Sequence, residues 1–121
     1  MSRRTMFVLV AVAIIAMALS ACGGGAAQSA PLAVTVKTTE FKFDPATINA
    51  APGQSINLTL DNTKGSVDHT FVLPAANVKM TVPAGKTGTQ TFTAPAAGSY
   101  DFTCDIAGHK EAGMTGKLVV K

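Results

Sequence analysis

The sequence is poor in the residues on which several protein classes depend. Among its 121 residues there are no tryptophans, one tyrosine, two cysteines and two histidines, and charged side chains make up 14%. The only arginines are Arg3 and Arg4, so no basic cluster follows them. A nucleic-acid-binding domain needs a basic patch or stripe. The composition therefore excludes nucleic acid as a partner.

The chain also lacks an amphipathic helical pattern after residue 33. Apolar and polar residues instead alternate at residues 34–36, 41–43, 56–60 and 89–93, and turn-forming pairs such as Asp44-Pro45 separate these runs. Short alternating segments divided by turns predict an all-β sandwich or barrel. Its core is predicted to contain Phe41, Phe43, Leu58, Leu60, Phe71, Phe92, Phe102 and Val119.

The first 21 residues have the pattern of an export signal. Two arginines precede a run of fourteen apolar residues, 6–19, which is short for a bilayer-spanning helix of about 20 residues and typical of a signal peptide. Residues 19–22, Leu-Ser-Ala-Cys, resemble the lipobox of bacterial lipoproteins, which implies cleavage before Cys22 and a lipid on its sulfur. An ordinary signal peptide cleaved near Ala21 is the alternative.

Removal of residues 1–21 leaves a nearly neutral chain with a flexible start. Without the two arginines, eight of the ten basic residues remain against seven acidic ones, a side-chain net charge of +1. Residues 22–33 are mostly small and uncharged, and such a composition predicts a flexible tether. We expect a protein of the cell envelope, anchored to a bacterial membrane through Cys22, with its domain facing the periplasm or the cell exterior.

A lipid on Cys22 leaves Cys104 without a disulfide partner. An exported protein with two cysteines ordinarily suggests a disulfide, and that alternative stays open. A lone thiol in an exported domain is a liability unless something occupies it. A metal ion is the obvious occupant.

Metal-binding residue types gather on residues 104–114. Cys104, His109 and Met114 are separated by four residues each, and Gly108 and Gly113 provide bends between them. His69 is the only other histidine and lies in an apolar segment, 67–73. A lone histidine is usually structural, but two histidines, one cysteine and one methionine are the ligand set of blue-copper electron-transfer sites.

From residue 34 to 121 the chain resembles the cupredoxins, the small blue copper proteins that include plastocyanin, azurin and auracyanin. The most specific likeness is residues 102–114, supported by residues 41–45 and by Asp68-His69-Thr70-Phe71. The resemblance implies a Greek-key sandwich of seven or eight strands and one type 1 copper ion. It also implies equatorial ligands His69, Cys104 and His109, and Met114 as the axial ligand. Thr70 stands where plastocyanin and azurin have asparagine, and its hydroxyl could make a similar hydrogen bond near the cysteine sulfur.

The function that the resemblance implies is that of a monomeric single-electron carrier and not an enzyme. Its partners would be redox proteins such as a cytochrome, a reaction centre or an oxidase. Electrons would enter or leave through the edge of His109. A partner could approach closely because the neighbours of His109 are small, and residues 74–76 could extend this patch (Ala107, Gly108, Ala112, Gly113, Pro74, Ala75 and Ala76).

The main alternative is a copper-binding delivery protein of the cell envelope that shuttles no electrons. Such carriers are often rich in methionine, whereas only Met80 and Met114 follow the signal segment. A Cys–His nucleophilic enzyme would leave both Met114 and His69 unexplained. Zinc is disfavoured because methionine suits it poorly and copper binds more tightly. Binuclear or multicopper centres need more cysteine or histidine than the chain contains.

Overall fold

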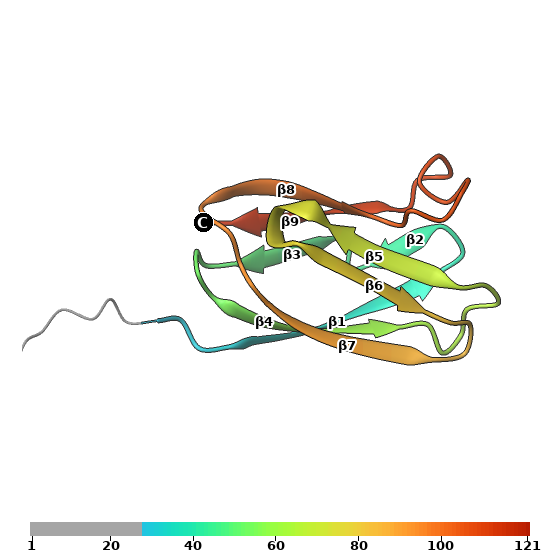
Figure 1. The fold of residues 1–121 in the computed structure, drawn as a ribbon, viewed down its shortest axis with the longest axis horizontal. Coiled ribbons are helices and arrows are strands. Elements are labelled where there is room, and N and C mark those ends of the chain that lie inside the picture. The colour runs from blue at the N-terminus through green and yellow to red at the C-terminus, as the bar shows by residue number, and fades with distance from the viewer. Residues whose placement is uncertain (1–27) are drawn as a thin grey trace, which may run out of the picture.

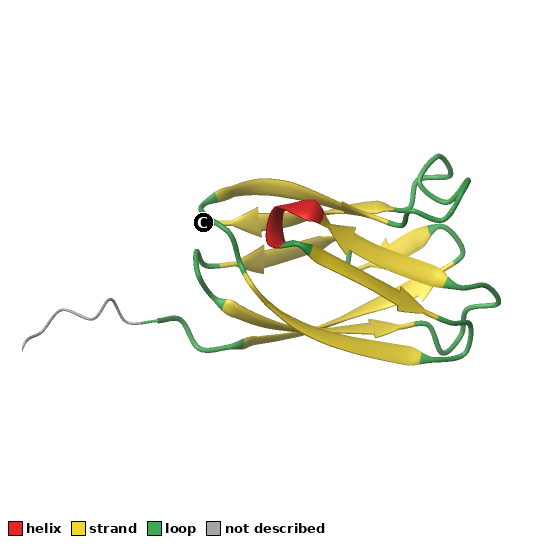
Figure 2. Cartoon of the chain, in the orientation of Figure 1, coloured by secondary structure: helices red, strands yellow, loops and turns green. Residues whose placement is uncertain are grey.

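The computed structural model describes residues 28–121, which form two β-sheets packed face to face (Figures 1 and 2). The predicted signal peptide, the lipidation at Cys22 and the first half of the tether lie outside the described residues. Within residues 28–121, no helix is long and apolar enough to cross a membrane.

Nine strands and one short 3₁₀ helix make up the described part of the chain. One sheet has the order β2-β1-β4-β7 and the other β3-β9-β8-β5-β6. In chain order the elements are β1 (Leu32–Thr39), β2 (Lys42–Asp44), β3 (Thr47–Ala50), β4 (Ser55–Asp61), β5 (His69–Leu73), η1 (Pro74–Ala76), β6 (Val78–Val82), β7 (Thr87–Thr93), β8 (Gly98–Thr103) and β9 (Thr115–Val120).

The predicted all-β Greek-key sandwich is confirmed, but the described residues contain nine strands and not seven or eight. The additional strand arises because residues 42–50 are divided between the two sheets. β2 pairs with β1, whereas β3 pairs with β9. Pro45 lies between them, and proline interrupts a strand because it has no N–H group to donate to a neighbour.

The folded domain begins two residues before the predicted boundary at residue 34. Leu32 and Ala33 are part of β1 and lie opposite Ile56 and Asn57 in a parallel pairing. Leu32 is also partly buried against the core. The predicted tether therefore overlaps β1, because these two residues have strand partners that the composition alone does not reveal.

Three phenylalanines form the centre of the core. Phe71 and Phe102 stack with ring centroids 4.6 Å apart, and Phe43 lies edge-on to both at 5.9 and 5.2 Å. Full burial of such a side chain contributes about 1.5–3 kcal/mol. Six of the eight predicted core residues are buried.

Phe41 and Val119 are the two errors in the predicted core. Phe41 belongs to the two-residue turn between β1 and β2 and is 40% exposed. Val119 is only partly buried, because the alternation of β9 turns Leu118 and Val120 inward. A strand presents alternate residues to opposite faces, so one of three consecutive apolar residues had to face outward.

One end of the sandwich is held together by the buried side chain of Asn62, at the end of β4. Its Nδ2 donates to the carbonyl oxygens of Val67, Val82 and Pro83 at 2.9, 3.2 and 3.1 Å. Its Oδ1 accepts a hydrogen bond from Thr38 Oγ1 at 2.8 Å. Asn62 therefore joins the β4–β5 loop, which leads into His69, to the end of β6 and the β6–β7 turn.

We expect Asn62→Ala to destabilise the metal-free protein by more than the about 1–3 kcal/mol typical of one unsatisfied buried polar group, because several partners lose their hydrogen bond together. Urea unfolding measures this. The control is Asn57→Ala, since Asn57 is exposed on β4 and its side chain accepts one bond, from Thr91. An equal, small loss of stability in both variants would contradict the role assigned to Asn62.

Candidate metal centre

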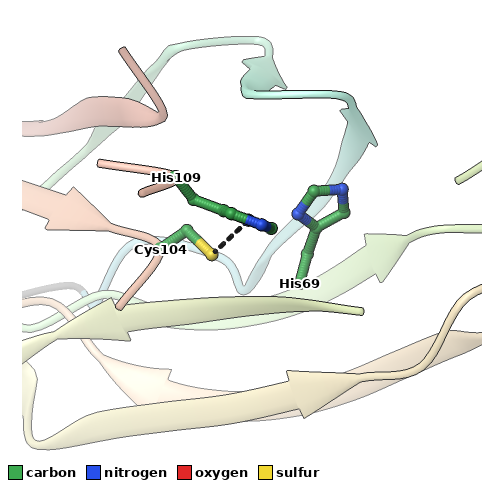
Figure 3. Close-up of side chains that lie close together, drawn as sticks. All are labelled: His69, Cys104 and His109. Carbon is green, nitrogen blue, oxygen red and sulfur yellow. Dashed lines mark hydrogen bonds between the residues drawn. The ribbon is translucent and has the colours of Figure 1, made fainter. Parts of the chain in front are cut away.

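The structure brings His69, Cys104 and His109 together at the end of the sandwich that Asn62 organises (Figure 3). One ligand atom from each residue lies within 4.8 Å of the others, and all three residues are buried. The sulfur of Cys104 lies 3.4 Å from His109 Nδ1. The two imidazole rings have centroids 5.1 Å apart. This juxtaposition is the one expected from the sequence.

Two different kinds of element position these side chains. His69 is the first residue of β5, so its backbone is fixed by pairing with Val82 of β6. Cys104 and His109 belong to the loop that connects β8 to β9. Within this loop the N–H of His109 donates to Ile106 O at 3.0 Å and that of Gly113 to Lys110 O at 2.9 Å.

The backbone of Met114 forms hydrogen bonds with both Cys104 and His109 and so closes the loop. Its N–H donates to His109 O at 3.0 Å, and its carbonyl accepts from Cys104 N at 3.2 Å. The Met114 side chain is fully buried in the same cluster as Cys104. Gly113, directly before it, has a φ of 102°, a conformation that glycine adopts readily and other residues avoid. The predicted fourth donor therefore lies at the base of the loop.

His69 is a buried imidazole without a protein partner. It is 0% exposed, and neither ring nitrogen has a hydrogen bond. Buried polar groups are almost always paired because leaving one unpaired costs free energy. Burial, followed by the proximity of His109, lowers the pKa of His69, which favours the neutral ring with a free lone pair. A neutral imidazole is the form that binds a metal ion.

The donor set fits a type 1 copper ion. A thiolate and a thioether favour Cu(I), and imidazole suits copper in both oxidation states. Cys104 is free among the described residues. Cys22, its partner in the alternative disulfide, lies outside those residues. The metal interpretation stands on the buried, unpaired donors of His69 and the adjacent thiol.

Thr70 lies where the sequence placed a hydrogen-bonding hydroxyl. Its backbone N–H donates to the Cys104 sulfur at 3.4 Å. Its Oγ1 is also 3.4 Å from that sulfur, but only 2.7 Å from Asp105 Oδ1. A hydroxyl has one hydrogen, and the closer carboxylate is the stronger acceptor. The main hydrogen-bond donor to the Cys104 sulfur is therefore the backbone N–H of Thr70.

Asp105 is a contributor to this site that the sequence reasoning missed. Besides accepting from the Thr70 hydroxyl, it donates its own N–H to Thr70 Oγ1 at 2.8 Å. Lys79 of β6 lies 2.7 Å from its other oxygen. The hydrogen bond from Lys79, followed by that from Thr70, lowers the pKa of Asp105. Its position directly after Cys104 was the only available signal in the sequence.

His109 is the one member of the cluster that reaches the surface, with 9% of its area exposed. Its small neighbours Ala107, Gly108, Ala112 and Gly113 are exposed around it, as expected. The expectation that residues 74–76 extend this patch is wrong. These residues form η1, the short helix drawn red in Figure 2, which follows Leu73 at the end of β5 opposite His69. β5 starts at the site and runs away from it.

Comparison with known proteins identifies relatives over most of the chain. The profile of the cupredoxin-like domain matches residues 7–120. The copper-resistant cuproprotein CopI of Rubrivivax gelatinosus is 33% identical over 81% of this chain and 71% of its own length. Auracyanin-A of Chloroflexus aurantiacus is 30% identical over 95% of this chain and 96% of its own length.

Solved structures show the same fold. The dithionite-reduced auracyanin of Roseiflexus castenholzii superposes with a TM-score of 0.66 at 22% identity, over 77% of this chain and 99% of the other. Auracyanin A of Chloroflexus aurantiacus, described as a "blue" copper protein, superposes with a TM-score of 0.62 at 23% identity, over 75% of this chain and 99% of the other.

The metal-free protein should lose stability as the pH falls below 6.5, the ordinary pKa of histidine. Below that pH the unfolded chain binds a proton that buried His69 resists, so the free energy of unfolding falls. One proton accounts for at most about 1.4 kcal/mol per pH unit. Urea unfolding between about pH 7.5 and 5 measures the slope.

The matched variant for this test is His69→Gln, which cannot titrate and should show a shallower slope over the same range. The contribution of Asp105 falls in a separate pH window, because the stability that a lowered carboxyl pKa provides is lost only as the pH falls below the ordinary value of 3.8. Identical slopes for the two proteins above pH 5 would refute the account given for His69.

Proposed function

The chain belongs to the cupredoxin-like family, and on that premise we propose that it is a single-electron carrier. Its cofactor is one type 1 copper ion. We propose His69, Cys104 and His109 as the equatorial ligands and Met114 as the weak axial one. The observation that supports this most directly is the buried His69 ring, with both nitrogens unpaired beside a free thiol.

Bound copper supplies one-electron chemistry by alternating between Cu(I) and Cu(II). The protein holds the ligand side chains in nearly fixed positions while the charge changes. His69 is held by a paired strand, and the loop of Cys104 is closed by the backbone bonds of Met114. The Thr70–Asp105 bonds tie that loop to β5. Ligands fixed in this way reorganise little, which favours electron transfer.

We propose His109 as the point where electrons enter and leave. It is the most exposed of the four side chains, since Cys104, Met114 and His69 are 0% exposed. Its small exposed neighbours allow a redox protein to approach closely. Weak electron-transfer encounters use small interfaces, so a cytochrome, a reaction centre or an oxidase could dock here. The carrier would act as a monomer.

The same burial argues against an enzyme. A nucleophilic cysteine must reach its substrate, whereas Cys104 is fully buried. Four donors from the protein would also leave no open position on the metal for a substrate, which a catalytic metal site retains. We therefore propose that the chain transfers electrons without catalysing a reaction of its own.

The second candidate is a copper-binding delivery protein, favoured by the 33% identity to a protein named for copper resistance. Such a carrier must release its ion to a partner. His69 and Cys104 are both fully buried, so release would require the loop 104–114 to open. This geometry supports the electron carrier over the delivery protein.

We further propose that the domain is tethered to a membrane of the cell envelope by lipid on Cys22. From Cys22 to the start of β1, ten residues reach at most about 33–36 Å when extended. This length allows the domain to reorient near the membrane surface. Cells expressing the full chain should incorporate labelled palmitate into the protein, and the Cys22→Ala variant should not. Equal labelling of both would exclude this anchor.

Copper-loaded protein comprising residues 23–121 should be intensely blue when oxidised and should bleach reversibly on reduction. Cys104→Ser should abolish the colour while keeping the β-sheet circular dichroism, because the thiolate–copper bond produces the absorption. Met114→Gln should keep the blue colour and lower the reduction potential, since the axial ligand tunes it. A wild-type complex that is colourless or green and releases its copper readily to an acceptor would support the delivery protein. Colour that survives in Cys104→Ser would refute the ligand assignment.

A further inference from the structure

Phe41 covers the one ligand that reaches the surface. Its ring lies edge-on to the His109 ring, with centroids 5.1 Å apart and an interplanar angle of 85°. His109 also lies close to the ring of His69 and the sulfur of Cys104. The imidazole therefore neighbours both the other proposed ligands and an aromatic side chain from a different part of the chain.

The backbone at Phe41 is in a conformation that phenylalanine rarely adopts. Its φ is 63°, in the left-handed region, where glycine or asparagine is usual and a bulky residue is an outlier. The other non-glycine residue at positive φ in residues 28–121 is Asn77, a residue type that tolerates it. Strain of this kind persists only where surrounding contacts maintain it.

Strand pairing and a side-chain hydrogen bond hold the turn that carries Phe41. Thr39 and Lys42 form the last pair between β1 and β2. The hydroxyl of Ser66 donates to a carboxylate oxygen of Glu40, which connects the turn to the β4–β5 loop just before His69. The position of Phe41 over His109 is therefore fixed by tertiary contacts and not by its own local preference.

We propose that Phe41 is a positioning residue of the copper centre, a cover that orients the His109 ring and limits the access of water to it. This inference rests on the proposed function. An aromatic pair in edge-to-face geometry is favourable beyond the apolar area that it buries. Contacts around a metal ligand fix its orientation, and the apolar shell controls solvent access and reduction potential.

The direction of the effect on potential follows from charge. The oxidised site, with Cu(II) and a thiolate, carries one more positive charge than the reduced site. An apolar cover disfavours the more highly charged state and so raises the reduction potential. Removal of the cover should lower the potential and ease copper loss.

The test compares Phe41→Gly, which removes the cover and suits the positive φ, with Phe41→Tyr, which keeps the ring. Phe41→Gly should lower the reduction potential and weaken copper binding about tenfold, the lower end of the loss seen when an outer contact to a metal ligand is removed. Phe41→Tyr should stay close to wild type in both. Val67→Ala is the control, because Val67 is an equally exposed apolar side chain, at 41%, two residues before His69.

The copper-free protein provides an independent readout. The NMR resonances of the His109 ring protons should lose their ring-current shift in Phe41→Gly, keep it in Phe41→Tyr, and be unaffected by Val67→Ala. The urea midpoint of Phe41→Gly should stay near that of wild type, since relief of the strained φ offsets the lost contact. A large drop in midpoint would instead assign Phe41 to general packing and overturn the proposal.

Different outcomes would refute the electron carrier and the role of Phe41 as a cover. If wild-type protein binds no copper, the electron-carrier proposal fails, while the copper-free measurements still test the contact between Phe41 and His109. If wild type is blue but Phe41→Gly has the same potential and affinity, the cover is refuted and the electron carrier stands. Equal shifts in Phe41→Gly and Val67→Ala would also refute a specific role for Phe41.

Discussion

The unpaired, buried imidazole of His69 is the constraint on which the rest of this structure depends. The interior of a β-sandwich has no place for a polar ring without partners, yet neither nitrogen of His69 has a hydrogen bond. Asn62 shows the contrast: it is equally buried, but its side chain is bonded to four other residues. A satisfied buried polar group indicates a structural role, and an unsatisfied one beside a thiol indicates a metal-binding role.

Strand pairing and side-chain hydrogen bonds together fix the segments around His69. Pairing with β6 fixes β5, and Asn62 fixes the loop that precedes it. The loop that carries Cys104 and His109 is attached to β5 through Asp105 and Thr70. Two separate segments are thus held in register by groups that need not touch the metal. This arrangement explains how a domain with a modest core can fix several ligands at once.

The strand pattern and the grouping of three metal-binding side chains on one loop could be predicted from sequence because both follow from local spacing. Alternation fixes which residues of a strand face inward, and three of the four proposed donors lie within residues 104–114. Asp105, Asn62 and Phe41 could not be assigned, because their roles depend on partners distant in sequence. Apolar residues are usually inside, which predicts Phe41 in the core, whereas its turn faces the site. Local sequence also does not reveal that β5 runs away from the site and carries residues 74–76 with it.

Burial also separates the two functions that the ligand set allows. An electron needs only a short path through a ligand that reaches the surface, and we propose that His109 with its small neighbours provides this path. Transfer of a copper ion to another protein needs an opening through which the ion can leave, yet His69, Cys104 and Met114 are completely buried. Delivery would require breaking the bonds that join residues 104–114 to one another and to β5. The burial of the ion-binding side chains therefore supports the proposed carrier of single electrons over the delivery protein.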